Sequence, residues 1–157
     1  MTGGDIARIE ESRARIYAWA YRILRNHDDA LDATQDVLVR ALAAPRTEHF
    51  VAWLRRVTIN LSIDLVRRRR TEGLSTEPQA PDAETPIEDE RRSRLVAALE
   101  GLTPQQRSVL VAKACDGETF EAIARSMGIA ASTAKTHYVR ALRRMRDLLG
   151  PAEGDLS

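Results

Sequence analysis

The chain has 157 residues, with 24 Lys and Arg against 23 Asp and Glu, so its formal net charge is +1. This length allows one domain or two small ones, and the single cysteine, Cys115, excludes an internal disulfide. Charged residues interrupt the N-terminal segment, and no run of about 18 uncharged apolar residues occurs, so we expect neither a signal peptide nor membrane insertion. These features predict a soluble protein of the cytoplasm.

Residues 5–71 form the first predicted domain, which is helical throughout. Apolar residues recur at helical spacing in three runs: Ile9, Ile16, Ala20, Ile23 and Leu24; Ala30, Ala33, Val37, Leu38 and Ala41; Phe50, Leu54, Val57, Leu61 and Leu65. The stretch 26–28 separates the first helix from the second, for which Asp28 or Asp29 is the expected cap. Pro45 separates the second from the third, because proline disfavours the helical conformation at the residue before it.

The second and third helices each carry polar residues away from their apolar faces. Helical spacing places Asp32, Gln35 and Asp36 together, on a face that the core residues of the same helix leave open. The third helix leaves Arg55, Arg56, Asn60 and Arg67 outside its apolar stripe and ends in four consecutive arginines, residues 67–70. Such charged faces are typical of contact surfaces, although solvated helix surfaces and ends show the same pattern.

Residues 72–90 separate two helical segments and have a different composition. They hold seven acidic residues and no Lys or Arg, together with Gly73, Pro78, Pro81 and Pro86. Few large apolar side chains are present to offset the cost of ordering the backbone, about 1–2 kcal/mol per residue. The sequence therefore predicts a flexible acidic linker here.

Residues 91–150 form the second predicted domain and contain a helix-turn-helix pattern. Thr103-Pro104-Gln105-Gln106 is a typical helix start, with threonine as N-cap and proline at the first helical position. A helix over 120–127 ends at Gly128, and Ser132 is the expected cap of the next helix. The fold class predicted for the chain is therefore all-α, with two small helical domains. Cys115 is expected to be a small core residue.

The last helix has a basic, hydrogen-bonding face that could enter the major groove of DNA. Its candidate DNA-contacting residues are Ser132, Thr133, Lys135, Thr136, His137 and Arg140, with Arg143 and Arg144 adding non-specific attraction. The residues expected to anchor it are Ala134, Tyr138, Ala141, Leu142 and Met145. No histidine or cysteine lies at metal-ligand spacing, and no phosphate-binding glycine loop is present, so we expect no metal, no cofactor and no enzymatic activity.

Together these motifs resemble the bacterial sigma-70 family of RNA polymerase sigma factors, in its extracytoplasmic-function (ECF) group. The similarity to the family's region 2 rests on residues 21–38, 50–60 and 64–70, and the similarity to region 4 on residues 102–107 and the helix-turn-helix. The resemblance implies that the chain binds core RNA polymerase and recognises the −35 and −10 elements of promoter DNA. It also implies a chain that is monomeric when free and is held inactive by an anti-sigma protein.

The resemblance assigns roles to particular residues. It implies that Asp32, Gln35 and Asp36 dock the clamp helices of the largest polymerase subunit, and that the flap of the second-largest subunit is a further contact. It implies that Arg55, Arg56, Asn60, Asp64 and Arg67 serve the −10 element, where a flipped-out base is held and Asn60 helps to read it. The loop over residues 43–49, which helps to build the pocket for that base, is shorter here than is usual in the family.

Two other functions fit parts of the pattern. A DNA-binding regulator would bind an operator through its last 50 or so residues and use the first domain for dimerisation or sensing. Such a regulator would be a homodimer on a palindromic site. A sigma-like decoy would occupy an anti-sigma protein without transcribing, and would keep the fold but lose the DNA-contacting residues. Those residues are largely present in this chain.

Overall fold

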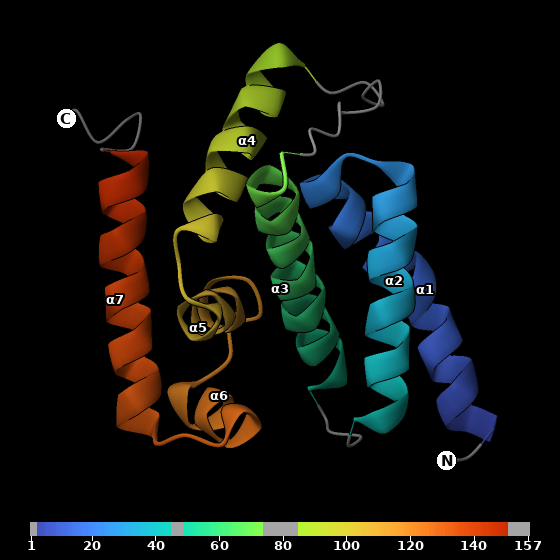
Figure 1. Ribbon diagram of the computed structural model, residues 1–157. Coiled ribbons are helices and arrows are strands. Elements are labelled where there is room, and N and C mark those ends of the chain that lie inside the picture. The colour runs from blue at the N-terminus through green and yellow to red at the C-terminus, as the bar shows by residue number, and fades with distance from the viewer. Residues whose placement is uncertain (1–2, 45–48, 74–84, 151–157) are drawn as a thin grey trace. The chain divides into compact units, whose positions relative to one another are not determined.

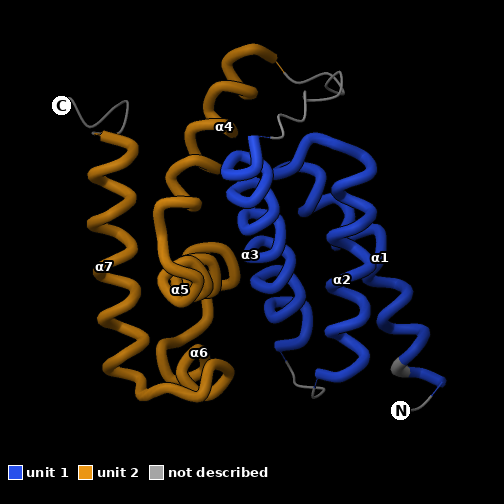
Figure 2. Tube along the Cα trace, in the orientation of Figure 1, with its two compact units in different colours: residues 1–84 blue, residues 85–157 orange. Residues whose placement is uncertain are grey.

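A computed structural model describes residues 3–44, 49–73 and 85–150 and shows seven α-helices and no strand within these ranges. The all-α fold class predicted above is confirmed. The chain divides into two compact units, residues 1–84 and residues 85–157 (Figures 1 and 2). Each unit carries its own buried apolar core.

Unit 1 is formed by three long helices, α1 (Gly3–Leu24), α2 (His27–Ala43) and α3 (Phe50–Thr71), each of which packs against the other two. Between α1 and α2 the backbone of Arg25 takes a positive φ of 52°, and Asn26 then caps α2 by accepting a hydrogen bond from the backbone N–H of Asp29 at 3.0 Å. The prediction that Asp28 or Asp29 caps this helix is wrong, because the chain reverses at Arg25 and α2 begins directly after Asn26.

Large apolar side chains make the core of unit 1. The buried residues are Ile9, Ile16, Val37, Leu38, Ala41, Phe50 and Leu54 in one cluster, and Ala20, Leu24, Ala30 and Ala33 in a second. The predicted inner face of α2 is therefore confirmed. On α3, Leu54 is buried, whereas Val57, Leu61 and Leu65 are half-buried against the clusters.

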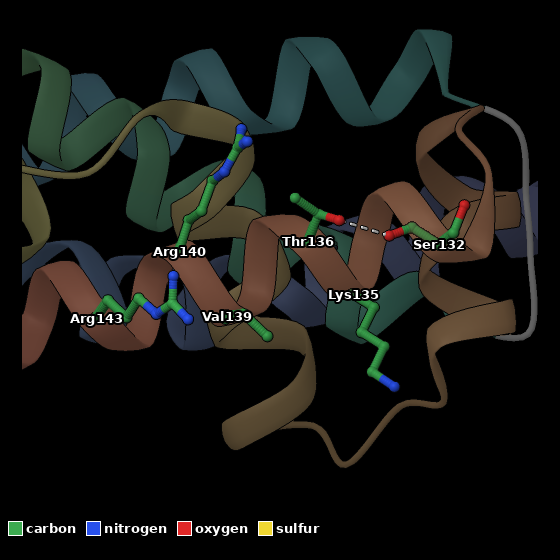
Figure 3. Close-up of a pocket in the computed structure, with 6 residues that line it drawn as sticks. All are labelled: Ser132, Lys135, Thr136, Val139, Arg140 and Arg143. Atoms are coloured by element: carbon green, nitrogen blue, oxygen red, sulfur yellow. Dashed lines mark hydrogen bonds between the residues drawn. The ribbon is translucent and has the colours of Figure 1, made fainter.

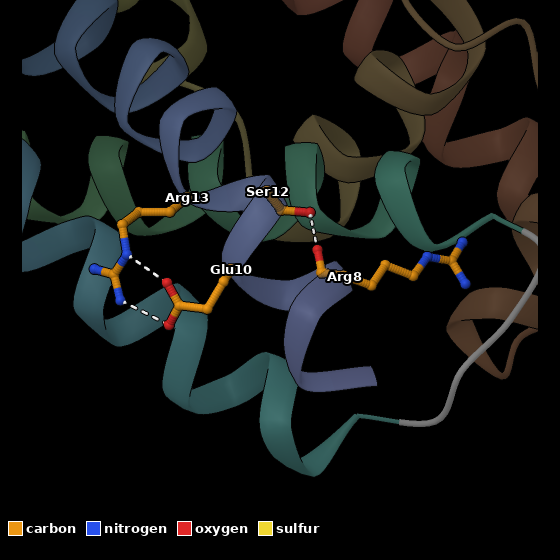
Figure 4. A network of polar contacts seen from close by, with 4 residues as sticks. All are labelled: Arg8, Glu10, Ser12 and Arg13. Carbon is orange, nitrogen blue, oxygen red and sulfur yellow. Dashed lines mark hydrogen bonds and ion pairs between the residues drawn. The ribbon is translucent and has the colours of Figure 1, made fainter. Parts of the chain in front are cut away.

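Polar contacts along α1 support its N-terminal half (Figure 4). Arg13 donates two hydrogen bonds to the Glu10 carboxylate, at 3.0 and 3.1 Å, and these bonds lower the pKa of Glu10. The Ser12 hydroxyl donates to the backbone carbonyl of Arg8 at 3.0 Å. The Arg8 guanidinium lies 5.4 Å from the centre of the Phe50 ring, a cation–π contact that joins α1 to the start of α3.

Unit 2 is formed by α4 (Pro86–Glu100), α5 (Pro104–Ala114), α6 (Phe120–Met127) and α7 (Ala131–Leu149). The predicted linker extended to residue 90, but its last five residues are helical. Thr85 and Glu88 form a reciprocal capping box around Pro86, and the acidic residues of this stretch lie in the first turn, where they complement the helix dipole. Residues 74–84 of the predicted linker lie outside the described residues.

Small side chains dominate the core of unit 2. Its buried cluster consists of Val109, Ala112, Ile123, Ala124 and Ala134, with Phe120, Met127, Ile129, Ala131 and Tyr138 packed around it. Cys115 is exposed at the C-cap of α5 rather than in the core, because the α5 helix ends there and the turn carries it to the surface.

A buried arginine completes unit 2. Arg107 is 1% exposed, and it donates hydrogen bonds to the backbone carbonyls of Leu99, at 3.0 Å, and Leu102, at 3.1 Å. Carbonyl groups at the end of a helix have no partner within that helix, so this side chain satisfies acceptors where α4 ends. The α4–α5 turn is thereby fixed to the body of α5.

Candidate nucleic-acid interface

Helix α7 is held against unit 2 by its inner face. Gly128 ends α6 in the left-handed conformation, with a φ of 67°, and the chain enters α7 three residues later. Ala134 and Ala141 are fully buried, and the ring of Tyr138 packs edge-on against Phe120 at 5.6 Å between ring centres. The short connection and the buried inner face make α6 and α7 a helix-turn-helix, as predicted.

Two predictions about α7 are corrected. Ser132 does not cap the helix, because α7 begins at Ala131 after an extended Ala130 that makes no side-chain cap. The packing of Ile129 and Ala131 against the core of unit 2 sets this earlier start. Leu142 was expected to anchor the helix but is 45% exposed, since it lies to one side of the stripe through Ala134 and Ala141.

The outer face of α7 forms an open hollow with a basic and hydroxyl lining, which we call the α7 hollow (Figure 3). The residues that line it are Ser132, Lys135, Thr136, Val139, Arg140 and Arg143. Each of them lies three or four residues from at least one other, so they share one side of the helix. The Thr136 hydroxyl donates to the backbone carbonyl of Ser132 at 3.0 Å, and its methyl group remains on the surface.

Of the eight predicted −35 residues, Thr136 and four others line this hollow: Ser132, Lys135, Arg140 and Arg143. Thr133 and Arg144 are exposed on the same helix. His137 is half-buried and its Nδ1 atom is inaccessible, so it lies at the border of the face. Val139 is a residue that the sequence reasoning missed. Its spacing of four from Lys135 could have placed it there, but an apolar residue was not considered for a polar face.

The five residues predicted for the −10 element have different environments on α3. Arg67 is exposed, Asn60 and Asp64 are half-buried, and Arg56 is 5% exposed. Arg55 is half-buried, with its guanidinium 5.0 Å from the centre of the Trp19 ring. In this conformation Arg56 is too deeply buried to contact a phosphate. Residues 45–48 of the shortened loop lie outside the described part of the chain.

The predicted docking residues Asp32, Gln35 and Asp36 are all exposed on α2. Two apolar residues of the same helix are also exposed, Leu31 at 42% and Val39 at 64%. Exposed apolar groups beside acidic groups are typical of protein-binding surfaces. Helical spacing places Val39 on the face of Asp32, Gln35 and Asp36, as the sequence indicated, whereas Leu31 was not predicted to belong to it.

Asp29 lies on the same helix but has a different environment. It is buried, and its carboxylate pairs with the guanidinium of Arg69 near the end of α3. Burial raises the pKa of Asp29; the charge of Arg69 opposes this shift, whereas the neighbouring acids Asp32 and Asp28 add to it. One of the four consecutive arginines is therefore engaged in joining α3 to α2.

Within the described ranges, no helix is long and apolar enough to cross a membrane, and no group of three or more His, Cys, Asp or Glu residues could hold a metal ion.

Comparison with known proteins identifies the family. Residues 8–72 match Sigma-70 region 2, and residues 92–145 match Sigma-70, region 4. The chain is 35% identical over 162 residues to the RNA polymerase sigma-E factor of Streptomyces avermitilis, covering 95% of this chain and 89% of that protein. It is 32% identical over 153 residues to the ECF RNA polymerase sigma factor SigE of Mycolicibacterium smegmatis, covering 90% of this chain but only 60% of the longer relative.

A solved structure shares the fold. It is the sigma factor RpoE in complex with the anti-sigma factor NepR from Bartonella quintana, with a TM-score of 0.56 and 23% sequence identity, covering 97% of this chain and 100% of that one. The chain belongs to the ECF group of the sigma-70 family. It is an alternative sigma factor, of the class that directs transcription initiation.

Proposed function

We propose that this chain brings core RNA polymerase to a two-part promoter, with unit 2 reading the −35 element and unit 1 serving the −10 element and polymerase docking. The observation that carries this proposal is the α7 hollow, a basic face on the second helix of a helix-turn-helix whose opposite face is fully buried. The fixed inner face holds the outer one in place, so that its side chains can meet base edges in register.

The lining of the α7 hollow suits DNA chemically. Lys135, Arg140 and Arg143 make no ion pair with any residue in the described ranges, so their charges are available to DNA. A bidentate arginine contact to guanine contributes about 1–3 kcal/mol of base discrimination, and an apolar group such as Val139 can contact a thymine methyl. The mixture of charge, hydroxyl and apolar surface favours sequence reading over purely electrostatic binding.

We assign the −10 role to α3 through a smaller set of solvent-accessible residues. Asn60, Asp64 and Arg67 are accessible in whole or in part and combine hydrogen-bonding groups with a cation. Arg55 and Arg56 reach DNA only if their packed surroundings rearrange when the promoter melts. Such a rearrangement is compatible with base flipping, which itself requires a pocket of hydrogen-bonding groups.

The outer face of α2 is proposed to dock the clamp helices of the largest polymerase subunit through Asp32, Gln35 and Asp36. Leu31 and Val39 would supply apolar contact area beside these polar groups. The flap of the second-largest subunit is proposed to contact unit 2. An anti-sigma partner is also proposed, since a solved relative with this fold was crystallised with one. We further propose a chain that is monomeric when free and acts in the bacterial cytoplasm without catalysing a reaction.

The test is multi-round transcription by purified core polymerase on a pool of genomic fragments, with RNA 5′ ends sequenced. The wild-type chain should create discrete start sites that share two upstream elements. Asp36→Lys should abolish polymerase binding, whereas Glu11→Lys, which makes the same charge change at an exposed position on α1, should not. Lys135→Ala should weaken initiation at the same start sites.

A different result would support the alternative class. If core polymerase is neither bound nor redirected, and the chain alone protects a symmetric site as a dimer, the operator-binding regulator is correct and the docking role of α2 is wrong.

A further inference from the structure

One side of α1 carries an aromatic ring among three arginines, and we call it the α1 stripe. It consists of Arg8, Arg15, Trp19 and Arg22. Successive arginines are seven residues apart, or nearly two helical turns, and Trp19 lies four residues after Arg15 and three before Arg22. Residues at these intervals share one face of a helix, so the ring has a cation one turn away on either side.

The three arginines are exposed, and no acid of the described chain neutralises them. None makes an ion pair within the described ranges, although the exposed Glu11 lies one turn before Arg15. Arg8 points away from the ion pair between Glu10 and Arg13 (Figure 4). The positive charge on this side of α1 is therefore available to an anionic partner.

Aromatic rings accompany these charges where α1 packs against α3. The Arg55 guanidinium lies 5.0 Å from the centre of the Trp19 ring, and the Arg8 guanidinium lies 5.4 Å from the centre of the Phe50 ring. Phe50 is stacked in turn on Trp53, with 6.0 Å between the ring centres. Cations interleaved with aromatic rings are typical of surfaces that bind unpaired nucleic acid, because bases stack on the rings while the cations contact phosphates.

Trp19 is the ring that can accept a base. It packs against the core of unit 1 and is only half-buried, so it is both held in place and accessible, whereas Phe50 is 1% exposed. A partly exposed cation–π contact is weaker than the stack of a base on an aromatic ring, so a base can displace Arg55 from Trp19. The released guanidinium keeps its charge and can then contact a phosphate.

The stacking mode requires that the ligand be unpaired. In a duplex the faces of the bases are stacked on one another and only their edges are open in the grooves. Trp19 can therefore take a base only from a single strand. Promoter melting supplies such a strand beside α3, the helix to which the −10 role is assigned.

We propose that Trp19, with Arg15 and Arg22 on either side, binds the unpaired DNA strand of the melted promoter. One base stacks on Trp19 in the place that Arg55 occupies in the free chain. The inference rests on the proposed function, because melting by the polymerase holoenzyme supplies the ligand. It adds α1 to the DNA interface of unit 1 and gives a cause for the rearrangement that brings Arg55 to DNA.

Photo-cross-linking tests the site directly. The photoreactive amino acid p-benzoylphenylalanine replaces Trp19 in the reconstituted holoenzyme, which is bound to a promoter mapped by the transcription experiment. It should cross-link to one DNA strand in the open complex and not in the closed complex, where the DNA stays paired. The same replacement at Ala14, an exposed position about 140° away around α1, should give no cross-link to DNA.

Trp19→Leu tests the contribution of the stack. Leucine keeps an apolar side chain against the core of unit 1, and the thermal midpoint is measured beside affinity. The affinity of the holoenzyme for a promoter fragment with a mismatched, premelted bubble should fall roughly tenfold, as expected for the loss of one base–aromatic stack. Affinity for core polymerase should not change. Trp19→Tyr, which keeps an aromatic face, should retain most of the affinity for the bubble.

Arg22→Gln tests the charge beside the ring. The slope of log affinity for the premelted fragment against log salt should become shallower by about 0.7, the amount expected for one phosphate of a single strand. Arg13→Gln makes the same change of net charge on another side of α1, where Glu10 binds the guanidinium, and should change the slope less.

The outcomes separate this inference from the proposed function. If the residue at position 19 cross-links to polymerase, or if Trp19→Leu weakens binding to core polymerase, the α1 stripe is a protein contact and the inference is overturned. If no DNA cross-link forms while Lys135→Ala still weakens initiation, the inference fails and the proposed function stands. If Trp19→Leu lowers the thermal midpoint, the cross-link alone decides. If the wild-type holoenzyme melts no promoter, both fail.

Discussion

The two units are built on different principles. Unit 1 has three long helices around large apolar side chains such as Ile16, Phe50 and Leu54, and α3 begins without any side-chain cap. Unit 2 packs three helices of 15, 11 and 8 residues and the 19-residue α7 around a core rich in alanine, and threonine side chains cap α4, α5 and α6. Burial of large apolar groups contributes about 1.5–3 kcal/mol per side chain, whereas alanine contributes much less.

The contrast shows how unit 2 can be stable with little apolar surface. Each threonine cap satisfies backbone N–H groups at a helix start, and Arg107 satisfies carbonyl groups at a helix end. Small residues at the centre allow α7 to approach the other helices closely. The stability of unit 2 therefore depends on hydrogen bonds to backbone groups at its helix ends. The stability of unit 1 depends on the packing of large apolar side chains between its helices.

The largest expected effect comes from Arg107→Met. Methionine keeps much of the apolar volume but removes the hydrogen bonds to the carbonyls of Leu99 and Leu102. The Leu99 carbonyl keeps the backbone N–H of Leu102 as a donor at 3.2 Å, whereas a buried acceptor left without a partner costs about 1–3 kcal/mol. We expect a loss of about 3 kcal/mol in the free energy of unfolding of unit 2. Native-state hydrogen exchange should show faster exchange in α4, α5 and α7, with unit 1 unchanged. Equal loss of protection in α3 would contradict the independent stabilisation of the two units.

A cap substitution should have a smaller effect. Thr119→Ala removes the hydroxyl that accepts a hydrogen bond from the backbone N–H of Ala122 at 3.1 Å and should destabilise unit 2 by about 1 kcal/mol. Urea unfolding, followed by circular dichroism, measures the change. Ser93→Ala removes a hydroxyl from an exposed position inside α4; it is the control and should not destabilise the unit, since alanine has the higher helix propensity. If both variants unfold at the same urea concentration, the caps do not stabilise this unit.

The smallest effect concerns the pH dependence of unit 1. Because burial raises the pKa of Asp29 above its value in the unfolded chain, the folded chain binds this proton more tightly. The contribution of Asp29 to stability therefore falls as pH rises from the ordinary carboxyl pKa, near 4, through the raised value, and stays lower above it. Asp29→Asn should make the free energy of unfolding decline less steeply with pH. Urea unfolding at a series of pH values across that range measures the change.

The exposed Asp36 provides the control for that measurement. Asp36→Asn makes the same substitution at an exposed position of the same helix, so a change of the profile that both variants share reflects the lost charge and not the burial of Asp29. If the free energies of unfolding of Asp29→Asn and of the wild type run parallel at every pH, the charge of Arg69 fully offsets the effect of burial on the pKa of Asp29.

Most helices could be predicted because they rest on local signals. The apolar faces of α2 and α3 recur at helical spacing, and the threonine starts of α5 and α6 are short-range motifs. The boundary errors occurred where longer-range packing competes with local preference. Ser132 is a better cap than Ala130, yet the packing of Ile129 and Ala131 starts α7 earlier.

The candidate interface was predictable in part for a similar reason. Periodicity identified Lys135, Arg140 and Arg143 as one face, because helix geometry is regular. It did not identify Gln106 as a neighbour of Arg140 and Arg143, since Gln106 belongs to α5, a different helix. It also treated Arg55 and Arg56 alike, although one packs over Trp19 and the other is buried.

The sequence by itself determined the helices, their apolar faces, the helix-turn-helix and the family, because these depend on neighbours within a few positions along the chain. The packing of the helices established which polar groups are buried, as with Asp29, Arg56 and Arg107, and brought residues of α5 and α7 to one hollow. The physical reason is that burial and convergence depend on contacts between residues distant in the sequence. No local propensity encodes those contacts.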